Sequence, residues 1–177
     1  TPKSNTNIDK RIDYRFLDVR RPEIRAIFNI RSAVVRAVTE FFDSEGFTNI
    51  STPKITAAGV ESGAEMFAVK YFNKEAFLSQ SPQIYKQMMV AAGFEKVYEI
   101  GTVFRAEKSH TTRHVTEFTG VDMEMGFIKD MGDVMDAVEK LFIHIINYVN
   151  KNSTKDLETL KIELTPPKNI PRITMQE

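Results

Sequence analysis

Residues 96–125, KVYEIGTVFRAEKSHTTRHVTEFTGVDMEM, decide the fold of this chain. They are typical of two β-strands, Lys96–Glu107 and Arg113–Met125, joined by the short polar loop Lys108–Thr112. Because side chains alternate between the two faces of a sheet, each strand has one apolar and one polar face. The apolar faces carry Tyr98, Ile100 and Phe104 on the first strand and Val115, Val121, Met123 and Met125 on the second, with Glu117 as an exception. The polar faces carry Glu99, Gly101, Val103, Arg105 and Glu107, and His114, Thr116, Phe118, Gly120, Asp122 and Glu124.

The segments on either side of this hairpin predict helices packed on an antiparallel sheet. The predicted helices begin at Pro22 and end before Gly46, run from Ser81 and Pro82 through Ala92, and span Met131–Val149. The predicted strands are Phe47–Ile55, Met66–Phe72 and Glu75–Ser79. Pro53 cannot donate a ladder hydrogen bond, so its strand is expected at an edge or an interface. Short turns between consecutive strands favour an α+β fold, an antiparallel β-sheet flanked by helices.

The composition is that of an ordinary globular domain. The 177 residues are 42% hydrophobic and 27% charged, which excludes disordered, collagen-like and coiled-coil classes. The 24 basic side chains equal the 24 acidic ones, so any contact with RNA must come from a local patch. The absence of Cys excludes disulfides, thiolate metal sites and Cys nucleophiles. No apolar run approaches the roughly 18 residues of a membrane span, and residues 1–10 lack the apolar core of a signal peptide. We therefore expect a cytosolic protein with no membrane contact.

The polar face of the hairpin is a candidate nucleotide site. Phe118 interrupts that face with a flat apolar ring, on which a base could stack. Arg105 precedes a basic loop that contains Lys108, His110 and Arg113, and its planar guanidinium could hold a phosphate through two hydrogen bonds. The alternative is an ordinary sheet with one solvated face, which the alternation alone favours.

A second candidate site is the stretch QSPQIYKQ, residues 80–87. Gln83 and Lys86 are three residues apart in the first turn of the predicted helix, so they share one face. A lysine, an amide and the positive end of a helix dipole together suit a small carboxylate. Taken alone, the stretch is equally typical of an exposed first turn.

Common catalytic signatures are absent from the sequence. There is no Gly-x-x-x-x-Gly-Lys phosphate loop, no Gly-x-Gly-x-x-Gly, no His-Glu-x-x-His and no Gly-x-Ser-x-Gly. Of the three histidines, His144 lies among apolar residues of a predicted helix and is interpreted as a packing residue. The commonest nucleotide-binding and hydrolase families are thereby excluded.

The same stretches resemble class II aminoacyl-tRNA synthetases. Residues 104–118 are similar to motif two of that class, and Glu40–Ile55, which includes Pro53, is similar to motif one. Together with residues 80–87, the run FRAEKSHTTRHVTEFTGVDMEM at 104–125 resembles the aspartyl-tRNA synthetases of archaeal and eukaryotic type. The resemblance extends from about residue 10 to the end of the chain. It implies the class II catalytic fold and ligation of aspartate to tRNA in the cytoplasm.

The resemblance also assigns roles to individual residues. It implies two catalytic residues, Arg105, which binds the ATP α-phosphate and the aspartate α-carboxylate during activation, and Glu107, which faces the adenine side of ATP. The implied ATP site is Arg105, Ala106, Glu107, Arg113, His114, Val115 and Phe118, with Phe118 stacked on adenine. The implied aspartate site is Glu61, Ser81, Gln83, Ile84, Tyr85, Lys86, Arg105 and Asp122. Within it, Lys86 would pair with the side-chain carboxylate, and Asp122 would receive the ammonium group.

The resemblance places this chain as part of a larger enzyme. Residues 1–22 correspond to a hinge arm and residues 23–177 to the N-terminal part of the catalytic domain, before any motif three. The acidic Mg²⁺ ligands of the family are accordingly expected beyond Glu177, with no metal ligand in this chain, and the isolated chain is expected to be inactive.

Two alternatives remain open from the sequence. One is a neighbouring class II enzyme, such as asparaginyl-tRNA synthetase or asparagine synthetase, although a lysine facing the substrate favours a carboxylate over an amide. The other is a non-catalytic module for dimerisation or RNA binding. In either case a homodimer is expected around Phe47, Ile50 and Pro53, because this segment carries more apolar bulk than one helix face requires and resembles motif one.

Overall fold

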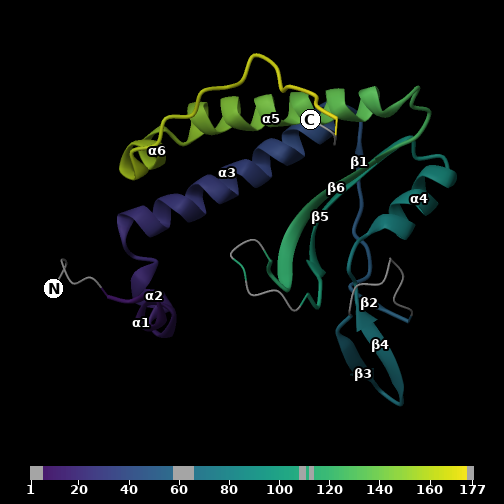
Figure 1. The fold of residues 1–177 in the computed structure, drawn as a ribbon, viewed down its shortest axis with the longest axis horizontal. Helices are drawn as coiled ribbons and strands as arrows, with labels where there is room; N and C mark the ends of the chain where they lie inside the picture. The colour runs from purple at the N-terminus through teal and green to yellow at the C-terminus, as the bar shows by residue number, and fades with distance from the viewer. Residues whose placement is uncertain (1–5, 58–65, 108–110, 112–113, 175–177) are drawn as a thin grey trace. The chain divides into compact units, whose positions relative to one another are not determined.

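The computed structural model describes residues 6–57, 66–107, 111 and 114–174. They form two compact units. One unit contains Thr1–Phe41 and Gly132–Glu177, and the other contains Phe42–Met131. Figure 1 shows the order of the elements along the chain.

The first unit is helical. Its elements are α1 (Ile8–Asp13), α2 (Arg15–Asp18), most of α3 (Pro22–Ser44), α5 (Met131–Asn152) and α6 (Thr154–Leu160). Ala33 of α3, Val149 of α5 and Leu157 of α6 meet in a buried cluster. The long helices α3 and α5 were both predicted, whereas α1, α2 and α6 were not.

A buried carboxylate organises the N-terminal arm of this unit. Asp18 is only 5% exposed. Its carboxylate accepts hydrogen bonds from Arg11 and Arg15 at 2.9 and 2.8 Å, and Arg21 lies 3.7 Å away. The segment predicted as a polar arm is therefore folded around an ion-pair cluster.

The second unit contains two three-stranded sheets. One has the order β1-β5-β6, built from β1 (Thr48–Asn49), β5 (Lys96–Phe104) and β6 (Glu117–Met125). The other has the order β2-β4-β3, built from β2 (Ile55–Thr56), β3 (Ala68–Tyr71) and β4 (Lys74–Leu78). Helix α4 (Gln83–Ala91) connects β4 to β5. All strand pairs are antiparallel except β1 with β5, which is parallel.

The predicted strand Phe47–Ile55 is wrong as a single element. The structure divides it into β1, which pairs with β5, and β2, which pairs with β4 in the other sheet. Pro53 lies between them and has no N–H to donate, so the chain changes sheets there. Both short strands lie at sheet edges among the described residues, as the proline predicted.

The predicted hairpin is confirmed, with shorter strands. β5 ends at Phe104 and β6 begins at Glu117, so Arg105–Glu107 and His114–Thr116 lie outside the ladder. One further backbone bond, from Arg105 N to Thr116 O at 3.0 Å, continues the pairing. The apolar face of β5 contributes Tyr98 to the core, where its ring stacks on Phe42 with centroids 4.6 Å apart.

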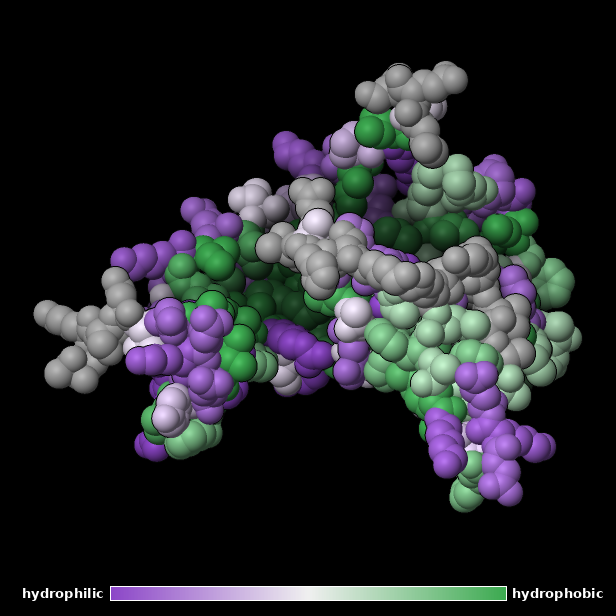
Figure 2. Space-filling model, turned by 60° about the horizontal axis from the view of Figure 1, so that its bottom comes forward, coloured by the Kyte–Doolittle hydropathy of each residue, from purple (hydrophilic) through white to green (hydrophobic). Residues whose placement is uncertain are grey.

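The surface mixes apolar and polar side chains, as the face in Figure 2 shows. Ile55 of β2 is 51% exposed and Tyr71 of β3 is 49% exposed. Both line an open groove of about 690 Å³, together with Pro53. Across the described residues, no helix is long and apolar enough to span a bilayer.

Candidate functional site

The register of the β5–β6 hairpin brings the predicted polar residues onto one face. Glu99 lies opposite Asp122, Gly101 opposite Gly120, and Val103 opposite Phe118. Successive pairs are two positions apart along both strands, so all six residues face one side of the sheet. The face thus has an acidic end and an aromatic end, with two glycines between them.

The two glycines leave room that the acidic side chains use. A Cβ on Gly101 would lie 2.9 Å from Glu99 Oε1, and one on Gly120 would lie 3.1 Å from Asp122 Oδ2. Both distances are shorter than ordinary van der Waals contact. The carboxylates therefore lean over a floor of glycine backbone and occupy the space that larger side chains would fill.

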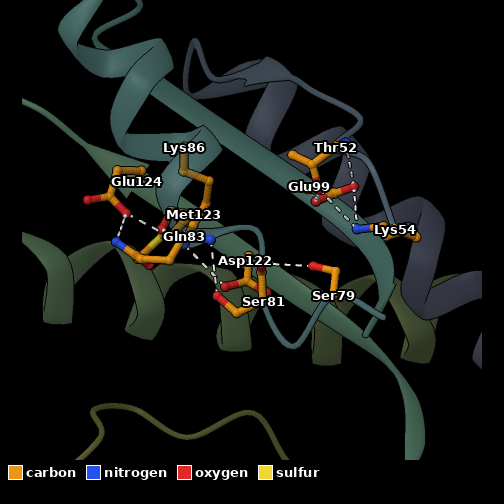
Figure 3. A network of polar contacts seen from close by, with 10 residues as sticks. All are labelled: Thr52, Lys54, Ser79, Ser81, Gln83, Lys86, Glu99, Asp122, Met123 and Glu124. Atoms are coloured by element: carbon orange, nitrogen blue, oxygen red, sulfur yellow. Dashed lines mark hydrogen bonds and ion pairs between the residues drawn. The ribbon is translucent and has the colours of Figure 1, made fainter. Parts of the chain in front are cut away.

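Helix α4 supplies a buried cation at the acidic end. Lys86 is 3% exposed. Its ammonium donates to Asp122 Oδ1 at 3.1 Å and to Met123 O at 3.0 Å, and it lies 3.5 Å from Glu124 Oε2 (Figure 3). Gln83, one turn earlier on α4, donates to the same Glu124 oxygen at 3.0 Å. The helix and the sheet are thus joined by the two residues predicted to face a carboxylate.

The start of α4 is capped one residue earlier than the usual position. The N-cap is Pro82, which has no side-chain hydrogen bond to give. Ser81 Oγ instead accepts from Gln83 N at 3.0 Å, while Ser79 Oγ donates to the carbonyl of Ser81 at 3.0 Å. Ser81 therefore shapes the first turn, on which Ile84 is exposed and Tyr85 half-buried.

The aromatic end of the face carries Arg105, the residue predicted to bind a phosphate. The guanidinium carbon of Arg105 lies 5.6 Å from the centre of the Phe118 ring, a cation–π contact. Beyond it, His114 Nε2 lies 3.8 Å from a carboxylate oxygen of Glu107. Ala106 is half-buried, and Val115 is 54% exposed. Glu61 and Arg113, as well as Lys108 and His110 of the predicted basic loop, lie outside the described residues.

The three residues predicted to form the dimer interface differ in how far they are exposed. Phe47 is 6% exposed, packs against Phe42 with centroids 4.8 Å apart, and has Lys96 over its ring. Ile50 is half-buried and donates its N–H to Tyr98 O, whereas Pro53 is exposed beside the groove. Phe47 is thus a core residue of its own unit.

Sequence reasoning missed a second lysine–carboxylate pair on this face. Lys54 Nζ lies 2.9 Å from Glu99 Oε1, and Thr52 donates to both oxygens of the same carboxylate. The sequence pattern placed Glu99 on the polar face but assigned it no role. The alternation that puts Glu99 on the same face as Arg105 was the signal that could have marked Glu99 as a site residue. The partners follow β1 in the sequence, so no local pattern pointed to them.

Comparisons with known proteins identify the family of the chain. Residues 7–177 match the family described as tRNA synthetases class II (D, K and N). The chain is 54% identical over 175 residues to an aspartate–tRNA(Asp) ligase of Pyrococcus horikoshii, covering 98% of this chain and 40% of that protein. It is 52% identical over 176 residues to an aspartate–tRNA(Asp/Asn) ligase of Methanoculleus marisnigri, covering 99% of this chain and 41% of that protein. The chain therefore spans about two fifths of the length of these relatives.

Solved structures show the same fold. The asparaginyl-tRNA synthetase of Pyrococcus horikoshii in complex with asparaginyl-adenylate superposes with a TM-score of 0.81 and 34% identity, covering 87% of this chain and 35% of that one. The aspartyl-tRNA synthetase of Entamoeba histolytica gives a TM-score of 0.74 and 37% identity, covering 89% and 29%. The α+β arrangement is that of the class II synthetases, and the chain belongs to the class II tRNA synthetases of the D, K and N group.

Proposed function

We propose that the protein containing this chain activates L-aspartate with ATP and transfers the aspartyl group to the 3′ end of aspartate tRNA. The observation that carries the proposal is a buried lysine, Lys86, at one end of a glycine floor, with Arg105 over Phe118 at the other. Two relatives named as aspartate–tRNA ligases, each more than half identical to this chain, support it.

The acidic end of the face is assigned to aspartate. Lys86 is a desolvated cation, which suits the side-chain carboxylate of the substrate better than a neutral amide. An ammonium group has three N–H donors, and those of Lys86 now face Asp122, Met123 O and Glu124. The incoming carboxylate takes the place of Glu124, which has the longest of these contacts and a second partner in Gln83. Asp122 then accepts from the substrate ammonium.

The aromatic end of the face is assigned to ATP. Phe118 provides the ring on which adenine stacks, and Ala106, Glu107, Arg113, His114 and Val115 surround the base. Arg105 carries a planar, permanently charged fork that binds the α-phosphate and the substrate α-carboxylate together. Both reacting groups are thus held on the polar face, between Lys86 at one end and Arg105 at the other.

The first chemical step is attack of the aspartate α-carboxylate oxygen on the α-phosphorus. A new P–O bond forms, the bond to the β-phosphate bridging oxygen breaks, and pyrophosphate leaves with the electron pair. Arg105 stabilises the charge that develops on the α-phosphate oxygens. In the second step a 3′-terminal ribose hydroxyl attacks the activated carbonyl and forms the ester bond. The bond between the carbonyl carbon and the phosphate oxygen breaks, AMP leaves with the electron pair, and the hydroxyl proton passes to solvent. The chain contributes mainly positioning and electrostatic stabilisation.

Mg²⁺ bound with ATP would neutralise phosphate charge during this reaction. Within the described ranges, no group of three His, Asp or Glu side chains is placed to hold a metal ion. None of the described residues is assigned to the ion in this proposal.

We also propose that the protein acts as a homodimer through the Pro53 segment. Pro53 and the exposed Ile55 border the groove of about 690 Å³, and among the described residues β2 is an edge strand of its sheet. Exposed strand edges favour pairing with another chain, and a two-fold contact is the commonest solution. Residues 1–22 act in this proposal as the hinge arm, and residues 23–177 as the first part of the catalytic domain.

The proposal is tested by ATP–pyrophosphate exchange in the full-length protein. Aspartate should support exchange, and asparagine should support less than about a hundredth of that rate, because a buried lysine rejects an amide. Exchange with asparagine alone would assign the protein to asparagine instead. Aminoacylation of aspartate and asparagine tRNAs then separates the two specificities named among the relatives. A protein that binds tRNA without any exchange would be a binding module.

A further inference from the structure

Two carboxylates lie on neighbouring strands at the acidic end of the site, and each has its own lysine. Glu99 and Asp122 are directly opposed on β5 and β6. Lys54 lies 2.9 Å from Glu99, and Lys86 lies 3.1 Å from Asp122. Figure 3 shows the two pairs as separate groups, one beside Thr52 and the other beside Gln83.

Glu99 is held as an anion inside the protein. Its side chain is 5% exposed. Burial acts to raise the pKa of Glu99, but hydrogen bonds from Thr52 and Lys54 outweigh it and hold the pKa below the usual value. The Glu99 carboxylate accepts three hydrogen bonds, from Thr52 N at 3.0 Å, Thr52 Oγ1 at 2.7 Å and Lys54 Nζ at 2.9 Å. Lys54 Nζ also donates to Thr52 Oγ1 at 3.1 Å.

This ion pair lies on the same floor as the substrate residues. A Cβ on Gly101 would be 3.0 Å from Lys54 Nζ as well as 2.9 Å from Glu99 Oε1. Lys54 is also connected through its backbone, because its carbonyl accepts from Ser79 N at 3.0 Å and Ser79 O accepts from Phe104 N at 2.9 Å. The lysine is therefore fixed beside the floor from two directions.

We propose that Lys54 is a positioning residue that neutralises Glu99, so that Lys86 stays available for the substrate carboxylate. This inference rests on the proposed function. Without Lys54, the buried charge of Glu99 would face Asp122 directly and attract the Lys86 ammonium behind it. An unpaired carboxylate at the floor would also repel the side-chain carboxylate of the substrate.

Lys54→Met removes the positive charge beside Glu99 and should therefore weaken the binding of aspartate. The aspartate KM should rise about tenfold or more, with kcat changed less than about threefold, because binding of an anion is what the free carboxylate opposes. Glu99 would lose its largest cationic partner, so burial would raise its pKa in the variant. Its protonation as the pH falls should then bring the aspartate KM of the variant back toward the wild-type value.

The second variant removes the charge that Lys54 balances. Lys54→Met combined with Glu99→Gln should return the aspartate KM to within about threefold of wild type, since an amide no longer repels the substrate. Lys54→Arg should retain most of the affinity, because it keeps the cation. Lys70→Met is the matched control, since Lys70 is an exposed lysine of β3 in the same unit.

The experiment measures aspartate-dependent ATP–pyrophosphate exchange in the full-length protein at pH 6, 7 and 8, with thermal unfolding of every variant. Absence of aspartate exchange in the wild type would defeat the proposed function itself. Given wild-type exchange, an unchanged KM in Lys54→Met overturns the role of Lys54. If Lys54→Met does not fold, the double variant decides: a restored KM supports the proposal, and a KM raised tenfold or more contradicts it.

Discussion

Lys86 Nζ on α4 lies 3.1 Å from Asp122 Oδ1 on β6, a contact between residues 36 positions apart in the sequence. The lysine is almost fully buried, whereas the side chain of Asp122 is 32% exposed. The pair therefore has one partner fixed in the interior and one accessible from the floor of the site.

Replacing Lys86 should change the KM for aspartate but not the KM for ATP. In the full-length protein, Lys86→Met should raise the aspartate KM at least about tenfold and leave the ATP KM within about twofold, because only the carboxylate loses its charged partner. Two carboxylates would also lose a cation, so unfolding should become easier by about 3 kcal/mol. Exchange assays with each substrate varied in turn check the first point, and denaturant titration checks the second. Gln87→Met, on the exposed side of the same turn, is the control, and equal effects on both KM values would contradict the assignment.

Arg105→Ala should suppress adenylate formation without unfolding the protein. Arg105 is exposed, so its loss costs little stability, but a bidentate contact made in the transition state is worth roughly 10²–10³ in rate. Arg105→Lys should recover only a small part, because an ammonium lacks the planar fork. Pyrophosphate exchange measures the loss, and a near-normal rate in Arg105→Ala would reject the role.

The Asp18 cluster predicts an acid-dependent loss of stability. Hydrogen bonding and attraction from Arg11, with further attraction from Arg15 and Arg21, lower the pKa of Asp18 below its ordinary value of 3.8. Because the pKa of Asp18 is lower in the folded state than in the unfolded state, ionised Asp18 stabilises the protein fully at any pH above the unfolded-state pKa. This contribution is lost as the pH falls through the folded-state pKa. The gap in unfolding free energy between wild type and Asp18→Asn should stay constant from pH 8 to about pH 5 and close below about pH 4.

Denaturant titrations at pH 7, 5, 4 and 3 measure this gap. Asp13→Asn removes an exposed carboxylate of α1 and serves as the control, with little effect expected at any pH. A gap for Asp18→Asn that is independent of pH down to 3 would show that the cluster acts through packing rather than charge.

Two substitutions near β1 and β2 should have opposite outcomes if the Pro53 segment forms the dimer. Ile55→Asp should give a folded monomer, because this side chain is 51% exposed on the edge strand and borders the groove. Phe47→Asp should instead unfold the unit, since a charge would replace a ring that packs on Phe42. Sedimentation analysis with circular dichroism distinguishes the two. A wild type that sediments as a monomer at high micromolar concentration would contradict the dimer.

Most of the candidate site could be predicted because its signals are local. The alternation of β5 and β6 places Glu99, Phe118 and Asp122 on one face, and a period of two needs no knowledge of the rest of the chain. Arg105 follows the end of β5 and lies over the Phe118 ring. The spacing of Gln83 and Lys86 likewise follows from one helical turn. The long helices α3 and α5 were predicted from their apolar period for the same reason.

The sequence by itself determined the hairpin, its two faces and the residue types available on them, because strand and helix periods are properties of neighbouring residues. Only the tertiary structure decided the partners. It divided the Pro53 segment between two sheets, buried Phe47 within its own unit, and matched Lys54 to Glu99 and Lys86 to Asp122. A sequence period fixes the direction of a side chain, whereas the choice between two nearby lysines depends on which chain segments pack beside the sheet.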